Sequence, residues 1–309
     1  MEIKNTIPDT LHGIVTGASC AVVTPFSGGD IDLDSFGKVL DHVLGGGIRS
    51  VVVCGTTGES PTLTDAEQLT LVRYAVEKCA GRAQVLCGAS SNSSIHAARR
   101  AVNAVKAGAD GVLCVTPYYN KASVDGMIAH YSMISDAVAD ASGSAGIILY
   151  NVPSRTGSAL SYEVLDALTE KENIVGIKEA SGDMRIVTGI ISRYGDRFGI
   201  WSGCDELNQP IMACGGVGCI SVLANVFPAA VGAMCRASLS GDHAAARRIS
   251  DMMRPAVDAL FCEVNPIPVK AAMADLGLCR EEYRLPLCAM TGEKRKRVRE
   301  AMERVRSEE

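Results

Sequence analysis

Eight short apolar runs recur along the chain, and this repeat constrains the fold more than any other feature. The runs begin roughly thirty residues apart, and each is followed by a segment of helical character. They are 19–23, 50–54, 83–87, 111–115, 146–150, a run within 173–181 that ends at Lys178, 198–202 and 218–222. Near-continuous apolar runs are typical of parallel strands buried on both faces. Eight of them alternating with helices predict an α/β protein with a (β/α)8 barrel fold, the TIM barrel.

The rival architecture is a doubly wound open sheet. A dinucleotide-binding sheet of that kind carries Gly-x-Gly-x-x-Gly directly after its first strand. Here the first run leads into Thr24-Pro25-Phe26, so the sequence gives little support for a dinucleotide-binding open sheet.

Strand signals stop at about Leu239. The segments that follow, 242–261, 268–276 and 291 to the end, have helical character. We therefore expect a barrel over 1–238 and a C-terminal helical region over 239–309. The last of these helices contains a basic run, 293–299, but Val298, Met302 and Val305 fall on one of its faces. An amphipathic helix is favoured over a nucleic-acid-binding arm.

Composition and charge exclude several classes of function. The net charge is −5, which argues against nucleic acid or an anionic membrane surface as the main partner. No apolar run approaches the roughly 20 residues that a membrane-spanning helix needs. Residues 1–13 have no cationic start followed by an apolar core, so a secretion signal is not expected. These features predict a soluble, cytoplasmic protein.

The cysteines and histidines do not form a recognisable ligand pattern. Twelve cysteines are scattered along the chain without a Cys-x-x-Cys pair, and the five histidines are isolated from one another. Without a secretion signal, a disulfide framework is not expected. The spacing also gives no support for a metal site.

Lys178 ends the sixth apolar run and Tyr150 ends the fifth. Active sites of this fold form at the carboxyl ends of the strands, so both side chains are expected at the same rim. Burial disfavours the charged form of lysine, and a neutral amine can attack a carbonyl to form a Schiff base. A neighbouring tyrosine can move protons as general acid and base. The alternatives are a lysine that extends its ammonium into water and a tyrosine at the edge of the core.

Three further polar residues follow predicted strands at this rim. Thr56 and Thr57 lie in the loop after the second run, between two glycines, where hydroxyls and backbone N–H groups can bind a carboxylate. Arg155 follows the fifth run, and its planar guanidinium can bind a second carboxylate. Taken singly, the threonines could shape a turn and Arg155 could form a surface ion pair. Together with Lys178 and Tyr150 they favour an active site.

Several longer motifs carry a resemblance to a known family. They are GTTGES at 55–60, TPYYNK at 116–121, YNVPSRTG at 150–157, GIKEA at 176–180, GGVGCISV at 215–222 and NPIPVK at 265–270. In these motifs the chain resembles the dihydrodipicolinate synthase family. That family belongs to the pyruvate-dependent class I aldolases, which also include N-acetylneuraminate lyase. The resemblance runs from about residue 17 to about residue 290.

The resemblance implies a set of catalytic residues. Lys178 forms the Schiff base with pyruvate, and its enamine attacks L-aspartate 4-semialdehyde to give 4-hydroxy-tetrahydrodipicolinate for diaminopimelate and lysine biosynthesis. Tyr150 relays protons together with Thr56 and with Tyr119, which comes from a neighbouring subunit. A homotetramer, built as a dimer of dimers, is therefore implied. No cofactor or metal is implied, because the imine replaces the metal of a class II aldolase.

The resemblance also implies the binding residues. Thr57 and the backbone of Ile220 hold pyruvate, and Arg155 binds the carboxylate of the semialdehyde. Gly203 and Asp205 line the same cavity.

Two other functions are possible from the sequence. Lyases for sialic acid or other sugar acids share the lysine and the tyrosine, but they generally lack an arginine at the position of Arg155, and often carry Ser-Thr in place of Thr56-Thr57. A binding barrel that has lost catalysis is the other possibility. The intact set of Lys, Tyr, Thr and Arg favours an enzyme of the synthase type.

Feedback inhibition by L-lysine is expected to be weak or absent. Lysine-inhibited members of the family typically carry an acidic residue at the position of His96, four residues after Asn92. Asp65 and Gln68 also replace the histidines of sensitive enzymes. A cation near the α-amino group of lysine repels it. Steady-state assays with added L-lysine test this expectation, and an inhibition constant in the low micromolar range contradicts it.

Overall fold

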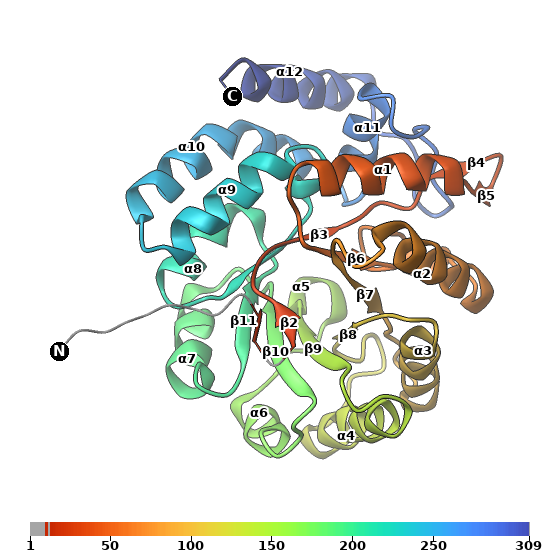
Figure 1. The fold of residues 1–309 in the computed structure, drawn as a ribbon, viewed down its shortest axis with the longest axis vertical. Helices are drawn as coiled ribbons and strands as arrows, with labels where there is room; N and C mark the ends of the chain where they lie inside the picture. Colours follow the sequence, from red (N-terminus) through yellow and green to blue (C-terminus); the bar gives the residue numbers. More distant parts are fainter. Residues whose placement is uncertain (1–9, 12, 309) are drawn as a thin grey trace.

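The computed structural model describes residues 10–308 except residue 12, and it contains a closed barrel of eight parallel strands (Figure 1). The strands are β3 (Gly17–Ala21), β6 (Ser50–Val53), β7 (Gln84–Gly88), β8 (Gly111–Val115), β9 (Gly146–Asn151), β10 (Ile174–Glu179), β11 (Gly199–Ser202) and β12 (Gly218–Ser221). They pair in chain order, and β12 closes the barrel by pairing with β3. This confirms the predicted (β/α)8 fold.

The first strand lies two residues earlier than its apolar run. Gly17 and Ala18 begin β3 because strand pairing uses the backbone, whereas the sequence pattern reports only side chains. A Cβ atom on Gly218, opposite Gly17 in the register, would lie 2.1 Å from the carbonyl oxygen of Gly17. The close approach of β12 and β3 therefore requires glycine at this point.

The strands are buried on both faces, which explains their continuous apolar runs. Alternate side chains point to opposite faces, so Val52 lies inside the barrel while Val51 and Val53 pack against the helices. The interior core consists of Ile14, Ala21, Val52, Leu86, Leu113, Ile148, Tyr150, Val152, Val175, Ala180, Trp201, Val217 and Ile220.

A layer of helices surrounds the barrel. It is formed by α1 (Leu33–Gly45), α2 (Asp65–Cys79), α3 (Ser94–Lys106), α4 (Val124–Ala141), α6 (Tyr162–Leu168), α7 (Met184–Tyr194), α8 (Asn208–Ala213) and α9 (Pro228–Leu239). A capping box formed by Thr64 and Glu67 starts α2. Short elements complete the loops: the hairpins β1 (Thr10–Leu11) with β2 (Ile14–Val15) and β4 (Phe26–Ser27) with β5 (Asp30–Ile31), the helix α5 (Pro153–Thr156), and the 3-10 turns η1 (Ser60–Thr62), η2 (Asp205–Leu207) and η3 (Leu223–Asn225).

Three more helices follow the barrel: α10 (His243–Leu260), α11 (Ile267–Asp275) and α12 (Gly292–Glu308). In Figure 1, α10 runs beside α9, and α12 lies at the outer edge next to α11. Val298, Met302 and Val305 are buried on one face of α12, which confirms the amphipathic helix predicted there. The division of the chain at residue 238 stays a prediction.

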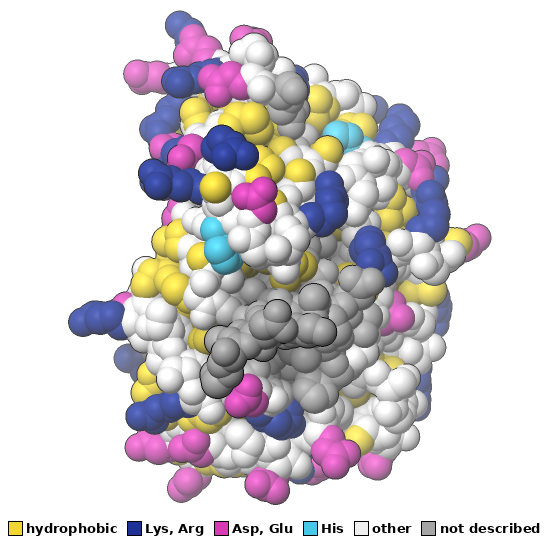
Figure 2. Space-filling model, turned by 60° about the vertical axis from the view of Figure 1, so that its left-hand side comes forward, with side chains coloured by type: hydrophobic (Ala, Val, Ile, Leu, Met, Phe, Trp, Pro, Cys, Tyr) yellow, Lys and Arg dark blue, Asp and Glu magenta, His cyan; other side chains and the backbone are white. Residues whose placement is uncertain are grey.

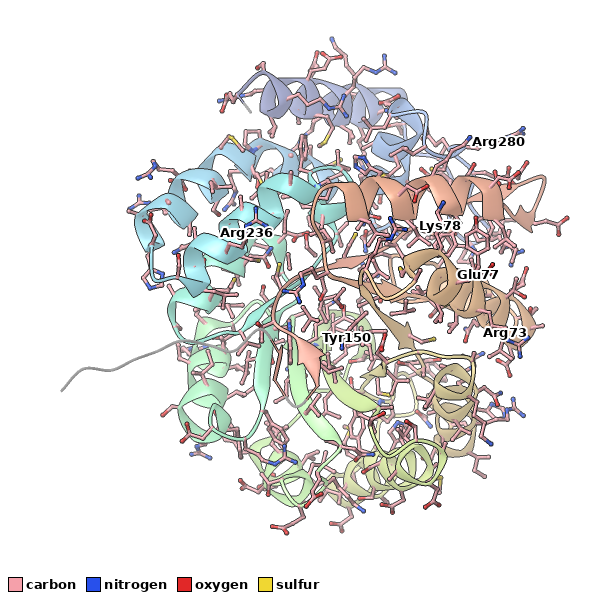
Figure 3. The ribbon with its side chains drawn as sticks, in the orientation of Figure 1. Arg73, Glu77, Lys78, Tyr150, Arg236 and Arg280 are labelled. Carbon is pink, nitrogen blue, oxygen red and sulfur yellow. The ribbon has the colours of Figure 1, made fainter. Side chains whose placement is uncertain are left out.

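Most charged side chains lie on the outside of this arrangement, and a few are buried: Glu59, Lys178, Glu179, Asp205 and Lys270. Figure 2 shows acidic and basic side chains interspersed over one face, and in Figure 3 Arg73 and Glu77 project from α2 while Tyr150 lies within the barrel. Among the described residues, no helix is long and apolar enough to cross a membrane. The prediction about a secretion signal concerns residues 1–13, most of which lie outside the described residues.

Candidate active site

Lys178 and Tyr150 lie side by side inside the barrel. They are direct partners in the register between β10 and β9, and the Lys178 Nζ atom lies 4.3 Å from the centroid of the Tyr150 ring. Both are largely buried, with 6% and 8% of their surfaces exposed. Each strand extends one residue beyond the predicted end, because Asn151 and Glu179 continue the pairing and the Asn151 amide donates to the Glu179 carboxylate at 2.8 Å.

Gly203 makes room for the lysine side chain. A Cβ atom at this position would lie 2.8 Å from Cε of Lys178 and 2.8 Å from Cβ of Ala180. Both distances are shorter than a van der Waals contact, so any other residue here would displace the lysine.

The loop after β6 positions the two threonines. Cys54 adopts a left-handed backbone conformation at φ 55°, which turns the chain sharply at the end of the strand. The loop is closed by a bond from the Gly58 N–H to the Gly55 carbonyl at 3.1 Å, and the Thr24 hydroxyl donates to the Gly58 carbonyl at 2.7 Å. Thr57 is buried within this loop and Thr56 is half-buried.

Arg155 stands on α5, directly after β9. Pro153 favours helix formation at the first position of α5, and Gly157 ends it with a left-handed conformation at φ 68°. The Arg155 guanidinium is exposed, and its Nη2 donates to the backbone carbonyl of Asn265 at 3.4 Å.

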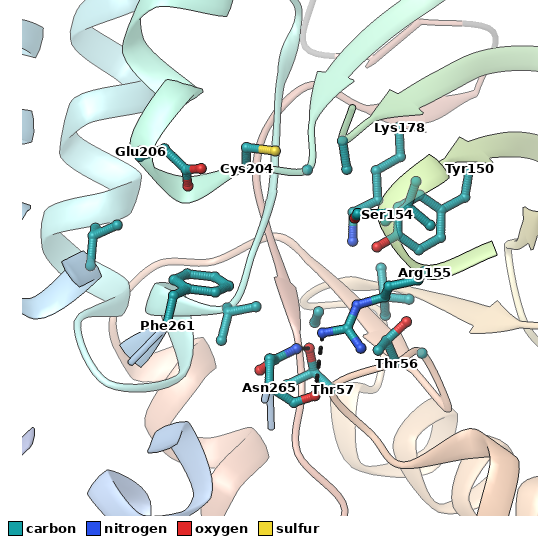
Figure 4. Close-up of a pocket in the computed structure, with 18 of the residues that line it drawn as sticks. Thr56, Thr57, Tyr150, Ser154, Arg155, Lys178, Cys204, Glu206, Phe261 and Asn265 are labelled. Atoms are coloured by element: carbon teal, nitrogen blue, oxygen red, sulfur yellow. Dashed lines mark hydrogen bonds between the residues drawn. The ribbon is translucent and has the colours of Figure 1, made fainter. Parts of the chain in front are cut away.

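These residues surround one cavity of about 520 Å³ at the carboxyl ends of the strands. It is lined by Lys178, Tyr150, Thr56, Thr57, Arg155 and Gly203, as the sequence predicts. Figure 4 shows Lys178 next to Tyr150, with Arg155 close to Asn265 and Thr57. The C-terminal region adds Arg254, Val257, Asp258, Phe261, Asn265 and Arg297 to the wall. The arrangement places an amine, a phenol and carboxylate-binding groups around one small space.

Comparison with known proteins assigns the family. The model of the dihydrodipicolinate synthetase family matches residues 14–305. The chain belongs to the dihydrodipicolinate synthetase family. It is 43% identical over 290 residues to the 4-hydroxy-tetrahydrodipicolinate synthase of Kosmotoga olearia, covering 93% of this chain and 97% of that protein.

Solved structures of the family agree in fold. The dihydrodipicolinate synthase of Aquifex aeolicus has a TM-score of 0.91 at 39% identity, covering 94% of this chain and 98% of that chain. The chloride-inhibited enzyme of Acinetobacter baumannii, solved in complex with pyruvate, has a TM-score of 0.90 at 35% identity, covering 94% of this chain and 98% of that one.

Three of the site residues inferred from the family resemblance lie outside this cavity's wall. The buried Asp205 carboxylate accepts the backbone N–H groups of Val222 and Leu223, both at 2.9 Å, so it fixes the turn after β12 instead of facing the cavity. The Ile220 side chain packs in the interior core with 1% of its surface exposed. The contact predicted for Ile220 is one of its backbone, so the buried side chain does not test it. The roles of Asp205 and Ile220 stay predictions.

Tyr119 is exposed and does not line the cavity that contains Lys178. It lies in the loop after β8 at φ 72°, and 90% of its surface is exposed. It lines a second cavity of about 510 Å³, whose wall also includes Tyr150, Thr56 and Arg155. Within the part of the chain that the structure describes, no hydrogen bond joins the hydroxyls of Tyr119, Tyr150 and Thr56. The proton relay inferred from the family therefore stays a prediction.

Several residues of this wall have no role predicted from the sequence, and Asn265 and Cys204 are two of them. Asn265 was noted only as part of the motif at 265–270, and its contacts with Thr57 and Arg155 become visible only in three dimensions. Cys204 lies beside Gly203 and lines the cavity. Burial, with smaller contributions from Glu206 and Asp205, raises the pKa of the Cys204 thiol to about 12, so it stays protonated and does not compete with Lys178 for a carbonyl.

A metal site is not formed by the described residues. Among residues 10–308 without residue 12, no group of three or more His, Cys, Asp or Glu side chains is arranged to bind a metal ion. The twelve cysteines, all of which are described, are free thiols.

Replacing Tyr150 with phenylalanine is expected to lower kcat by about 10²-fold or more, since the ring packing beside Lys178 is kept but the hydroxyl predicted to transfer protons is lost. Steady-state kinetics with both substrates measures the effect. Tyr162→Phe, on the outer helix α6, is the matched control and should retain activity. A Tyr150→Phe enzyme with unchanged kcat would exclude the phenol from proton transfer.

Proposed function

We propose that this chain is a lyase that condenses pyruvate with L-aspartate 4-semialdehyde to give 4-hydroxy-tetrahydrodipicolinate in diaminopimelate and lysine biosynthesis. The observation that carries the proposal is the pairing of Lys178 with Tyr150 in a cavity that also contains Thr57 and Arg155. The name of the Kosmotoga olearia relative, which aligns with 93% of this chain, supports the same reaction.

The first step joins pyruvate to the enzyme. The Lys178 amine attacks the keto carbon of pyruvate, and loss of one water gives an imine. Thr57 and the backbone of Ile220 bind the pyruvate carboxylate. The protonated imine withdraws electrons from the neighbouring methyl carbon. That carbon loses a proton to the Tyr150 oxygen while the phenol passes its own proton into the relay, and an enamine forms. Because the imine itself is the electrophile, the proposed reaction needs no metal or cofactor.

The second step adds the acceptor. The enamine carbon attacks the aldehyde carbon of the semialdehyde, and the aldehyde oxygen takes up a proton returned through the Tyr150 phenol. Arg155 pairs with the carboxylate of this substrate through a charge-assisted bond. The amino group of the bound acceptor then adds to the imine carbon and displaces Lys178. This closes the ring of the product and returns the free amine of the enzyme.

The exposed position of Tyr119 supports a role between subunits. An aromatic side chain with 90% of its surface exposed is available to a second copy of the chain. In a homotetramer arranged as a dimer of dimers, the partner's Tyr119 would complete the relay with Tyr150 and Thr56.

The binding of L-aspartate 4-semialdehyde as the second substrate is tested by replacing Arg155. Arg155→Leu is expected to raise KM for L-aspartate 4-semialdehyde by about 10- to 100-fold, because a charge-assisted bond to the carboxylate is lost. Trapping of pyruvate on Lys178 should stay unchanged, since Arg155 acts only on the acceptor. Arg73→Leu, on the exterior of α2, is the matched control.

The wild-type enzyme is assayed in parallel with pyruvate and sugar aldehydes. Faster turnover of a sugar aldehyde than of the semialdehyde would contradict the proposed acceptor and favour a sugar-acid lyase. An unchanged semialdehyde KM in Arg155→Leu would exclude the role given to Arg155.

A further inference from the structure

We propose that Asn265 is a positioning residue that aims the Thr57 hydroxyl at pyruvate. The inference rests on the proposed function, because it names the group that orients the pyruvate-binding hydroxyl. Asn265 comes from the C-terminal region, far from the barrel strands in sequence. It is 6% exposed and lies in the wall of the cavity.

The direction of one hydrogen bond carries the argument. The Asn265 side-chain Nδ2 lies 3.1 Å from the Thr57 Oγ1. An amide nitrogen only donates, whereas a hydroxyl has one proton to donate and two lone pairs that accept. The bond therefore occupies a lone pair of Thr57 and leaves its proton free. No other hydrogen bond of the Thr57 hydroxyl is formed among the described residues, so a carboxylate in the cavity is the acceptor that this proton lacks.

A second contact joins Asn265 to Arg155, the residue proposed to bind the semialdehyde. The backbone carbonyl of Asn265 accepts Nη2 of Arg155 at 3.4 Å. Figure 4 shows both bonds as dashed lines, with Asn265 below Arg155 and beside Thr57. Asn265 thus touches a pyruvate-binding residue through its side chain and a semialdehyde-binding residue through its backbone. Substituting the side chain should therefore affect pyruvate and spare the semialdehyde.

The position of Asn265 is fixed by a buried ion pair. Lys270, on α11, pairs with Glu59, and both side chains are completely buried. Glu59 follows Thr57 by two residues and Lys270 follows Asn265 by five, so the pair joins the same two segments that the amide bond joins. Lys270 also donates to the Glu282 carbonyl at 2.8 Å. The two segments are therefore held together at a fixed distance.

The other amide atom of Asn265, the buried Oδ1, forms no hydrogen bond with the described residues. Leaving a buried acceptor unpaired destabilises the folded state. Leucine has a similar shape and no polar atoms, so it would avoid this cost. An amide at this position is explained by its action on Thr57.

The test compares Asn265→Leu with Asn265→Asp. Pyruvate affinity is measured from the fraction of protein trapped by borohydride at increasing pyruvate concentration. Asn265→Leu is expected to weaken pyruvate binding about tenfold, without lowering Tm, since one bond that orients a charge-binding donor is lost. Asn265→Asp should weaken it further, because a carboxylate accepts the Thr57 proton and repels pyruvate. In both variants the KM for the semialdehyde should stay within about threefold of the wild-type value, because changes at independent sites do not affect one another.

A double-mutant cycle separates positioning from general structural damage. In a Thr57→Val background, Asn265→Leu should change pyruvate affinity by less than about twofold, because the hydroxyl that it orients is already absent. Asn103→Leu, on α3 and outside this cavity, is the matched control. The inference is overturned if Asn265→Leu has the same effect in both backgrounds, or if Asn265→Asp binds pyruvate as the wild type does. Wild-type protein that traps no pyruvate would instead overturn the proposed function.

Discussion

Replacing Lys178 with alanine is expected to lower kcat by roughly 10⁴-fold or more, because the reaction then has no nucleophile to form the imine. The side chain is largely buried and packs beside Tyr150, so its truncation leaves a cavity but no unpaired charge. The enzyme should remain folded. Steady-state kinetics, with circular dichroism to check folding, measures the change.

Lys171→Ala is the matched control for this variant. Lys171 precedes β10 at the opposite end of the strand from Lys178 and pairs with Asp136 on α4 at 2.6 Å. Loss of such a partly exposed pair costs about 0–1 kcal/mol and should leave kcat unchanged. Activity of Lys178→Ala within tenfold of the wild type would exclude the Schiff-base mechanism.

Replacing Lys270 with methionine is expected to destabilise the protein by about 3–5 kcal/mol, because it leaves the Glu59 carboxylate buried without its partner. Burial lowers the pKa of Lys270, and the adjacent Glu59 opposes that shift, so each charge depends on the other. The ammonium also lies 4.3 Å from the ring of Phe26. Urea and thermal unfolding measure the loss.

Two further variants show whether the loss comes from the unpaired charge. Adding Glu59→Gln to Lys270→Met removes the charge and should recover at least about half of the lost stability. Arg247→Met breaks the exposed pair with Asp251 on α10, whose side chains are 76% and 70% exposed, and should change stability by less than about 1 kcal/mol. Equal losses in Lys270→Met and Arg247→Met would contradict a buried ion pair.

The barrel could be predicted because its strands are buried on both faces. Continuous apolar runs such as 50–54 and 146–150 that recur eight times between helices are typical of parallel strands buried on both faces, as in a (β/α)8 barrel. The strand ends cannot be predicted in the same way. Gly17 and Ala18 carry no apolar side chain that could mark them, and β9 and β10 extend to Asn151 and Glu179 through a bond between two polar side chains.

The site could be predicted where its residues sit at the ends of strands. Lys178, Tyr150, Thr56, Thr57 and Arg155 follow this rule, and all of them line one cavity. Residues that reach the cavity from elsewhere could not be found in this way. Asn265 belongs to a loop between two C-terminal helices, and its amide bonds a residue 208 positions away.

Polar residues near a strand end are also ambiguous from sequence alone. Asp205 follows β11 as an active-site residue would, yet its carboxylate accepts two backbone N–H groups. Whether a carboxylate faces substrate or backbone depends on where the next strand ends, which a linear pattern does not report. Tyr119 presents a similar problem, because its proposed role requires a second copy of the chain.

The Schiff base on Lys178 is tested most directly by borohydride reduction of the folded protein in the presence of pyruvate, followed by intact mass and peptide mapping. We expect one stable adduct, with the mass of one pyruvate less one water plus two hydrogens, on Lys178 and on no other lysine. Lys178→Ala should give no adduct under the same conditions. Wild-type protein that remains unmodified, or that is modified equally on exposed lysines, would contradict the Schiff-base mechanism and favour a barrel that binds without catalysis.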